Sequence, residues 1–574
     1  MTGQRIALLL LVCVGAVYLA IVVGSPPGAF WTIDGGFKFL TVEQLAGTGF
    51  RDISIAYPGE SIDPSGDFFP LKPPMATRVH GRFVPDVSLA FPILTAPLYR
   101  ALSLPGLYVL PLISALACLW LTYLLARRYA GSWAPLAVPL VGLATPIFFY
   151  AVTFWEHNTA VLLTTAAVLL LARTEDRTPI GAALAAGLFL GMAVWFREEC
   201  YLFAGSTILA LLITRAGIRT VLGSAAGFTA AAVPLILFQW RVLGKPFGKR
   251  MQGASEFGLL PEETGPGITG YLSDRLETLY AWTLGLTQNL ETTLAVSIPL
   301  LLGLVTFIVL GRKSRLLAVP WAGTVAYSVL VLLVLAGLDD RVFSTYFSGG
   351  FFTTAPLMAA LLAGALAVTG TRRARGEAFI ATAVLLFFCV AVILSPVKYQ
   401  RGVHWGPRYL LPVFPLLVVL GLSGIRRACP DFRKRRFMLV LGSIILAFSL
   451  AVQTHGMATL QIKKRGTERT VSRFQESSPR TVVTNVWWFP LEIAVAYRKH
   501  PIYRVIDTED YHALLRQFRE AGIHRFTLVA SPAEDRILRD PVASVLKIEP
   551  HLTPSMRYFD LLICECELKA GRED

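Results

Sequence analysis

Residues 6–24 read IALLLLVCVGAVYLAIVVG, an uninterrupted apolar run that is long enough to cross the hydrocarbon core of a bilayer as a helix. The run is longer than the apolar part of a typical signal peptide. No small-residue cleavage motif of the A-x-A kind precedes Pro26 and Pro27. The stretch therefore predicts a retained first membrane span.

Further apolar runs of this kind follow along the whole chain. The 574 residues are 54% hydrophobic and only 16% charged, whereas a soluble globular chain has about 25% charged residues. Together with the first run, the sequence predicts an α-helical polytopic membrane protein of about 13 transmembrane helices. The other expected spans are 104–126, 133–152, 158–172, 179–196, 200–214, 218–240, 290–310, 317–336, 352–369, 378–396, 409–425 and 437–455.

Lys and Arg residues give these spans a direction. Placing the N-terminus in the cytoplasm puts most basic residues of the short loops inside, among them Arg127 and Arg128 and the cluster from Arg426 to Arg436. An odd number of spans then places the C-terminus outside the cytoplasm, in a membrane of the bacterial plasma-membrane type. The net charge of +15 is thus explained mainly by topology, and no nucleic-acid partner is expected.

Two domains are expected. A transmembrane domain covers residues 1–458 and carries long outer loops at 25–100 and 241–289, and the first loop includes an apolar, proline-interrupted stretch at 88–102 that predicts a re-entrant or interfacial segment. A small extracytoplasmic α/β domain covers residues 459–574, with expected strands at 481–486, 502–506 and 525–530 and a helix at 509–521. Acceptor recognition and packing against the outer face are both open as its role.

Ionisable residues at the hydrocarbon boundary are the candidate functional residues, because a charge is costly to place there. Just after the first span, WTIDGGFKFL places Asp34 beside two glycines and one helical turn before Lys38. A carboxylate at the bilayer surface can serve as a general base. The alternative is that Asp34 is the N-cap of a helix at 37–45.

Two more polar groups open to the same outer side. Glu156 and His157 lie between the third and fourth spans in FWEHN, where they suit either a cation site or a solvated turn, with Trp155 as an interfacial belt residue. In WFREEC, Arg197 precedes Glu198 and Glu199 in a tight outer turn. Its planar guanidinium suits a lipid phosphate, although neutralisation by a neighbouring Glu also explains it.

The strongest indication of a site is the segment SPVKYQRGVHWGPRYLLPVFPLL at 395–417. Arg401, His404 and Arg408 lie on the outer side here, against the positive-inside trend, and an anionic ligand accounts for them. Pro407, Pro412 and Pro415 are expected to break the start of the span and leave backbone groups to line a cavity.

These features resemble the GT-C superfamily of integral membrane glycosyltransferases, in particular the protein mannosyltransferase and aminoarabinose transferase kind, which use polyprenyl-phosphate-linked sugars. The resemblance rests on the layout of spans and on three motifs. These are the acidic residue in TIDGG at 32–36, the loop VHGRFVPDVSLAFPILTAPLY at 79–99 and the G-x-R-Y-x-x-P signature GPRYLLP at 406–412.

The resemblance implies an inverting hexosyl- or pentosyltransferase that moves a sugar from a polyprenyl-phosphate donor to a hydroxyl of an acceptor glycan, lipid or protein. It implies Asp34 as the catalytic base. It further implies that the donor phosphate is bound by Lys38, Arg197, Arg401, His404 and Arg408. Glu156, His157 and Glu198 are further candidate site residues.

No cofactor and no metal are expected. The acid after the first span is followed by Gly-Gly rather than by a second acid, so a paired-carboxylate metal site would need Asp52, Asp63, Asp67 or Asp86 to fold back. The rival functions are a lipid or glycan transporter or flippase and a lipid-linked glycan ligase. A transporter usually shows internal repeats, which this sequence lacks, and a ligase needs no acidic base after the first span.

Overall fold

The computed structural model describes residues 2–72, 75–85, 88–172, 178–244, 246, 268–285, 349–366, 374–394, 404–428, 432–476, 481–531, 543–551 and 560–569. In this part of the chain, five helices are long and apolar enough to cross a membrane. Four of them are α1 (Gly3–Val23), α4 (Val109–Tyr129), α10 (Ile218–Leu243) and α18 (Arg375–Leu394), and the fifth is the membrane part of α20 (Phe432–Glu476). The protein is therefore an integral membrane protein, and the expected spans 290–310 and 317–336 lie outside the described residues.

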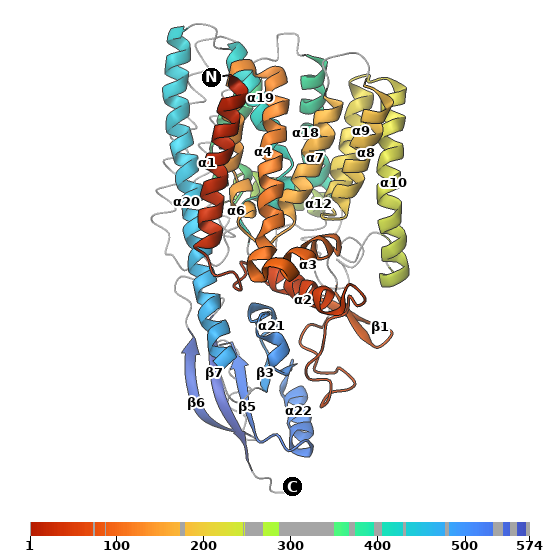
Figure 1. The fold of residues 1–574 in the computed structure, drawn as a ribbon, viewed down its shortest axis with the longest axis vertical. Helices are drawn as coiled ribbons and strands as arrows, with labels where there is room; N and C mark the ends of the chain where they lie inside the picture. The colour runs from red at the N-terminus through yellow and green to blue at the C-terminus, as the bar shows by residue number, and fades with distance from the viewer. Residues whose placement is uncertain are drawn as a thin grey trace.

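Shorter apolar helices fill the bundle between the long ones (Figure 1). They are α7 (His157–Leu171), α8 (Ile180–Val194), α9 (Cys200–Ile213), α17 (Leu357–Leu366) and α19 (Val413–Ala428). Figure 1 shows that α4, α7, α8, α9 and α10 run roughly side by side. These helices match the positions of the expected spans to within a few residues.

Two expected spans are broken by proline. The stretch 133–152 is not one helix but the 3-10 turn η2 (Gly131–Leu136) followed by α5 (Ala137–Ala144) and α6 (Ile147–Ala151), because Pro146 separates the last two. The stretch 352–369 is divided in the same way at Pro356, into α16 (Phe351–Thr354) and α17. A proline has no N–H to donate and its ring clashes with the preceding turn, which accounts for the interruption of these two runs at Pro146 and Pro356.

The first outer loop folds against one end of the bundle. It contains α2 (Ile33–Thr48), the antiparallel hairpin of β1 (Ala76–Val79) and β2 (Arg82–Pro85), and α3 (Ala90–Leu102). In Figure 1, α2 and α3 lie next to each other across the lower end of the bundle. The stretch 88–102 is thus largely a regular helix, with Pro97 inside it.

The C-terminal part contains a five-stranded sheet with the order β4-β3-β5-β7-β6. Strands β3 (Val482–Thr484), β4 (Ile502–Arg504) and β5 (Arg525–Ala530) are parallel, whereas β7 (Leu561–Leu568) and β6 (Ala543–His551) pair antiparallel. Between the strands lie α21 (Phe489–Glu492), the 3-10 turn η5 (Tyr497–Lys499) and α22 (Thr508–Glu520). The expected strands and helix of an α/β unit are present here.

Helix α20 connects the bundle to this sheet without interruption. It runs from Phe432 to Glu476, so residue 458, the expected domain boundary, falls inside a continuous helix. In Figure 1 it extends beyond the end of the bundle and reaches the sheet. At the junction the ammonium of Lys463 pairs with the carboxylate of Glu492 on α21, and both groups are buried.

The C-terminal part also packs directly on α2. A Cβ at Gly36 would lie well inside the van der Waals distance of the Leu491 carbonyl oxygen, so the two backbones can meet only because residue 36 is glycine. Beside this contact, Arg498 donates to Glu43 at 2.7 Å and to Gln44 at 2.6 Å. The helix that carries Asp34 is thus held between the bundle and the C-terminal part.

Candidate functional site

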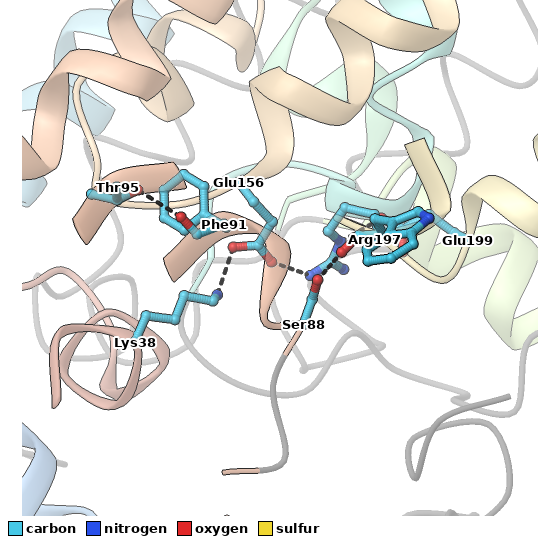
Figure 2. A network of polar contacts seen from close by, with 8 residues as sticks. Lys38, Ser88, Phe91, Thr95, Glu156, Arg197 and Glu199 are labelled. Atoms are coloured by element: carbon cyan, nitrogen blue, oxygen red, sulfur yellow. Dashed lines mark hydrogen bonds and ion pairs between the residues drawn. The ribbon is translucent and has the colours of Figure 1, made fainter. Parts of the chain in front are cut away.

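Glu156 is the centre of a buried ion cluster at the end of the bundle (Figure 2). Its Oε2 lies 2.7 Å from Nζ of Lys38 on α2, and its Oε1 lies 3.2 Å from Nη1 of Arg197 in the turn between α8 and α9. The Nε of Arg197 donates to Oε1 of Glu199 at 2.8 Å. Three segments that are far apart in the sequence are therefore joined at one place.

This cluster is stable as a buried unit because its charges balance. The side chains of Lys38, Glu156 and Arg197 are 3–5% exposed, and two cations face the two carboxylates of Glu156 and Glu199. Burial alone would raise the pKa of Glu156, but the charges of Lys38 and Arg197 outweigh it and hold that pKa below its usual value. The carboxylate of Glu156 is therefore ionised and fixes the two cations.

Arg408 adds a third cation beside this cluster. Its guanidinium lies 5.9 Å from the ring of Trp155 and 5.1 Å from the ring of Tyr409. Two more cations contact the same rings, since Lys38 lies 5.5 Å from the ring of Trp155 and Arg197 lies 5.8 Å from the ring of Tyr409. The two aromatic rings thus sit among three cations and stabilise them through cation–π contacts.

The position of Arg408 follows from the loop that precedes it. Gly406 has a φ of +70°, and a Cβ there would lie 2.6 Å from Cγ of Pro146, so only glycine fits. His404 is fully buried, and its Nδ1 lies 3.0 Å from the Gly406 carbonyl oxygen. The chain then forms the 3-10 turn η4 (Arg408–Leu410) before α19 begins at Val413, so the expected proline break at the start of this span is confirmed.

Asp34 lies in the first turn of α2, with its side chain partly buried. Asp34 and Lys38 are four residues apart on this helix, so they share one face with their Cβ atoms about 5–6 Å apart. The alternative role of Asp34 as an N-cap is wrong, because Thr32 occupies that position and the helix begins at Ile33 rather than at 37. Asp34 is thus placed one helical turn from the buried ion cluster.

The candidate residues converge to a large extent. Lys38, Glu156, Arg197 and Arg408 belong to one cluster, and His157 interacts electrostatically with Lys38, Arg197, Arg408 and His404. Glu198 is beside Tyr201 instead, and Glu199 is the partner of Arg197. Arg401 lies outside the described residues.

Three features of the site were missed or misjudged from the sequence. Trp155 is 2% exposed and its ring lies close to both Lys38 and Arg408, so the interpretation as a membrane-belt residue is wrong. Tyr409 contacts both Arg197 and Arg408 and accepts a hydrogen bond from Nη2 of Arg408 at 3.2 Å. The hydroxyl of Ser88 donates to the Trp195 carbonyl oxygen and ties the first outer loop to the turn that carries Arg197. An aromatic residue next to an unusual outer Arg was the one available indication for Tyr409.

The carboxylates considered for a metal site are engaged elsewhere or not described. Asp63 is fully buried and accepts from the Tyr57 hydroxyl at 2.7 Å and from the Phe68 N–H at 2.8 Å. Asp52 accepts from Gln44 and from the Ser54 N–H, and Asp67 accepts from the Ser65 hydroxyl. Asp86 lies outside the described residues, among which no group of three or more His, Cys, Asp or Glu side chains gathers. Glu156 itself faces two cations, which disfavours a metal ion next to it.

Known structures share this fold. The chain is similar to an oligosaccharyltransferase from Archaeoglobus fulgidus tethered with an acceptor peptide, with a TM-score of 0.50, 12% identity, and coverage of 91% of this chain and 68% of that one. It is also similar to ArnT from Cupriavidus metallidurans bound to undecaprenyl phosphate, with a TM-score of 0.45, 14% identity, and coverage of 96% and 97%.

No protein-family model matches the chain, and no curated protein matches it. The likeness to the oligosaccharyltransferase, a GT-C protein, confirms at the level of the fold the resemblance that the sequence motifs indicated.

Proposed function

We propose that the protein is an inverting glycosyltransferase that moves a sugar from a polyprenyl-phosphate donor to an acceptor hydroxyl. The observation that carries the proposal is the convergence of Lys38, Arg197 and Arg408, together with Asp34 one helical turn before Lys38 on α2. A buried group of cations suits a phosphate, and a nearby carboxylate suits a hydroxyl that must lose its proton.

In this mechanism, Asp34 accepts the proton of the acceptor hydroxyl while the hydroxyl oxygen attacks the anomeric carbon of the donor. The bond between that carbon and the phosphate oxygen breaks, and the polyprenyl phosphate leaves with the bonding electrons. The leaving phosphate gains a negative charge in this step. Lys38, Arg197 and Arg408 stabilise that charge, which lowers the barrier because the cations are already in place.

Glu156 orients this phosphate site. Each cation has more donors than Glu156 uses, since an ammonium carries three N–H groups and a guanidinium five. Glu156 uses one carboxylate oxygen for each cation, so it fixes the positions of Lys38 and Arg197 relative to each other. The carboxylates of Glu156 and Glu199 also reduce the repulsion between Lys38 and Arg197 when no donor is bound.

The charged groups lie at one end of the bundle, which supports an enzyme at the membrane surface over a transporter with charges near the midplane. From the distribution of Lys and Arg, we propose that this end is extracytoplasmic and that the N-terminus is cytoplasmic. A reporter fused after Asp574 tests the orientation. A reporter that is active only outside the cytoplasm should be active in this fusion. Activity of a reporter that works only in the cytoplasm would contradict the proposed orientation.

The function is tested with Asp34→Asn in reconstituted membranes supplied with a polyprenyl-phosphate sugar. We expect sugar transfer to fall about 10²- to 10⁴-fold, the usual contribution of a general base, while donor binding persists. Glu43→Gln is the matched control, because Glu43 lies on the same helix but pairs with Arg498. Undiminished transfer by the Asp34 variant would remove the proposed base.

A further inference from the structure

The turn before α7 and the first residues of α7 carry an unusual set of buried polar side chains next to the cations assigned to the donor phosphate. Thr153, Trp155, His157 and Asn158 are 0–3% exposed. Among the residues that the structure describes, no partner is found for the Thr153 hydroxyl, the Trp155 indole N–H, either nitrogen of His157 or the Asn158 side-chain oxygen. A buried polar group without a hydrogen bond destabilises a protein, so several such groups close together in the chain need an explanation.

Aromatic rings contact two of these residues, His157 and Trp155. The ring of His157 stacks on Tyr150 with centroids 4.6 Å apart and meets the edge of Trp155 at 4.5 Å. Tyr150 and Trp155 are 5.6 Å apart, so the three rings contact one another. Next to them, the Trp31 indole N–H is also buried and has no partner among the described residues, and its ring lies 5.1 Å from Phe149.

The ligand chemistry that fits these buried polar groups is a neutral polyol. Its hydroxyls offer donors and acceptors to an indole N–H, a threonine hydroxyl, an amide oxygen and an imidazole, which when neutral has one donor and one acceptor nitrogen. Its C–H faces pack on aromatic rings. A few placed polar groups within an aromatic lining are typical of a small-molecule site.

The position of these residues beside the cations indicates which part of which substrate they would bind. Trp155 lies 5.5 Å from Lys38 and 5.9 Å from Arg408, the cations assigned to the donor phosphate. The sugar of the donor is bonded directly to that phosphate, so it must lie next to these cations. We infer that Thr153, Trp155, His157 and Asn158, with the face of Tyr150, form the binding site for the sugar head group of the donor, an inference that rests on the proposed function.

The test compares lipids with and without the sugar, using the full chain in detergent. Binding is measured for undecaprenyl phosphate and for a panel of undecaprenyl-phosphate-linked hexoses and pentoses. The wild type is expected to bind at least one glycosylated lipid more tightly than undecaprenyl phosphate. His157→Phe should reduce that preference at least tenfold and leave the affinity for undecaprenyl phosphate unchanged, whereas Arg408→Ala should weaken binding of both lipids.

Measurements of thermal stability distinguish a ligand-binding role of His157 and Thr153 from a role in stabilising the fold. Because His157 makes no hydrogen bond with the described residues, His157→Phe should keep or raise the melting temperature, and the nearly isosteric Thr153→Val should do the same. Thr164→Val is the matched control, since the Thr164 hydroxyl donates to the Val161 carbonyl oxygen at 3.0 Å. That variant should lower the melting temperature and keep the preference for the glycosylated lipid.

Two results would overturn the inference in distinguishable ways. If the wild type binds the lipids but His157→Phe and Thr153→Val keep the full preference for the glycosylated one, the sugar site is wrong and the proposed function stands. If the wild type binds none of these lipids, the proposed function fails and the sugar site fails with it.

Discussion

Glu156 and Lys38 form a buried ion pair with 2.7 Å between Oε2 and Nζ, although one residue precedes α7 and the other belongs to α2 of the first outer loop. The same carboxylate holds Arg197 at 3.2 Å. One side chain of the bundle therefore fixes both the loop that carries Asp34 and the turn that carries Arg197. The geometry of the whole site depends on this one carboxylate.

Glu156→Gln should therefore destabilise the protein strongly. The substitution removes the negative charge and leaves Lys38 without the carboxylate that it faces, and breaking a buried ion pair in this way costs about 3–5 kcal/mol. The free energy of unfolding of the purified protein measures this. Arg525→Gln is the comparison, because its pair with Glu567 is 66% and 40% exposed and should contribute about 0–1 kcal/mol. Equal losses in the two variants would contradict the central role of Glu156.

Gly36→Ala should lower both stability and sugar transfer. The added methyl group collides with the Leu491 carbonyl oxygen, so α2 must move away from α21 and take Asp34 with it. Gly47→Ala on the same helix has nothing within 4 Å of the new Cβ and should be neutral or stabilise by about 0.5–1 kcal/mol. Melting temperature and turnover are measured for both. Full turnover in the Gly36 variant would show that the position of α2 does not matter.

The charged members of the cluster could be predicted from the sequence, because a charge at the hydrocarbon boundary is costly and such residues therefore tend to have a function. Lys38, Arg197 and Arg408 were found on this ground, and they do belong to one cluster. Their pairing was not predictable, since the contact of Lys38 with Glu156 depends on how α2 packs against the bundle. The choice of Glu199 over Glu198 as the partner of Arg197 likewise depends on the direction of a side chain in a tight turn.

For the fold as well, some features were predictable from the sequence and others depend on tertiary packing. Apolar runs predicted where helices lie, because burial in lipid requires such runs whatever the tertiary arrangement. They did not predict the interruption at Pro146 within 133–152, since a broken and an intact span are equally apolar. Nor did they predict that α20 continues as far as Glu476, because its polar end is stabilised by tertiary contacts with α21, in which Phe474 packs on Phe489 and Lys463 pairs with Glu492.

Gln453→Leu should weaken the site from a distance. The Gln453 side chain lies buried on α20, accepts from the Trp405 indole N–H at 3.0 Å and donates to the Thr354 carbonyl oxygen at 2.6 Å. Loss of both hydrogen bonds should cost about 1–3 kcal/mol and disturb the loop that positions Arg408. Stability and kcat/KM for the donor are expected to fall together. Thr454→Val, at the exposed neighbour, should change neither, and an unaffected kcat/KM in the Gln453 variant would argue against this link.

The thiols of β7 should report on folding of the C-terminal sheet. Burial raises the pKa of Cys564 to about 11 and that of Cys566 to about 12, and both side chains lie within the core between the sheet and α22. Because the thiolate is the reactive form, a maleimide at pH 8 should leave both residues unmodified in the native protein and modify them after denaturation. A background with Ser at Cys13, Cys389 and Cys429 leaves Cys118 and Cys200, both buried, as the only other thiols of the chain. Rapid labelling of Cys564 or Cys566 in this background, without denaturant, would show that the sheet is open in solution.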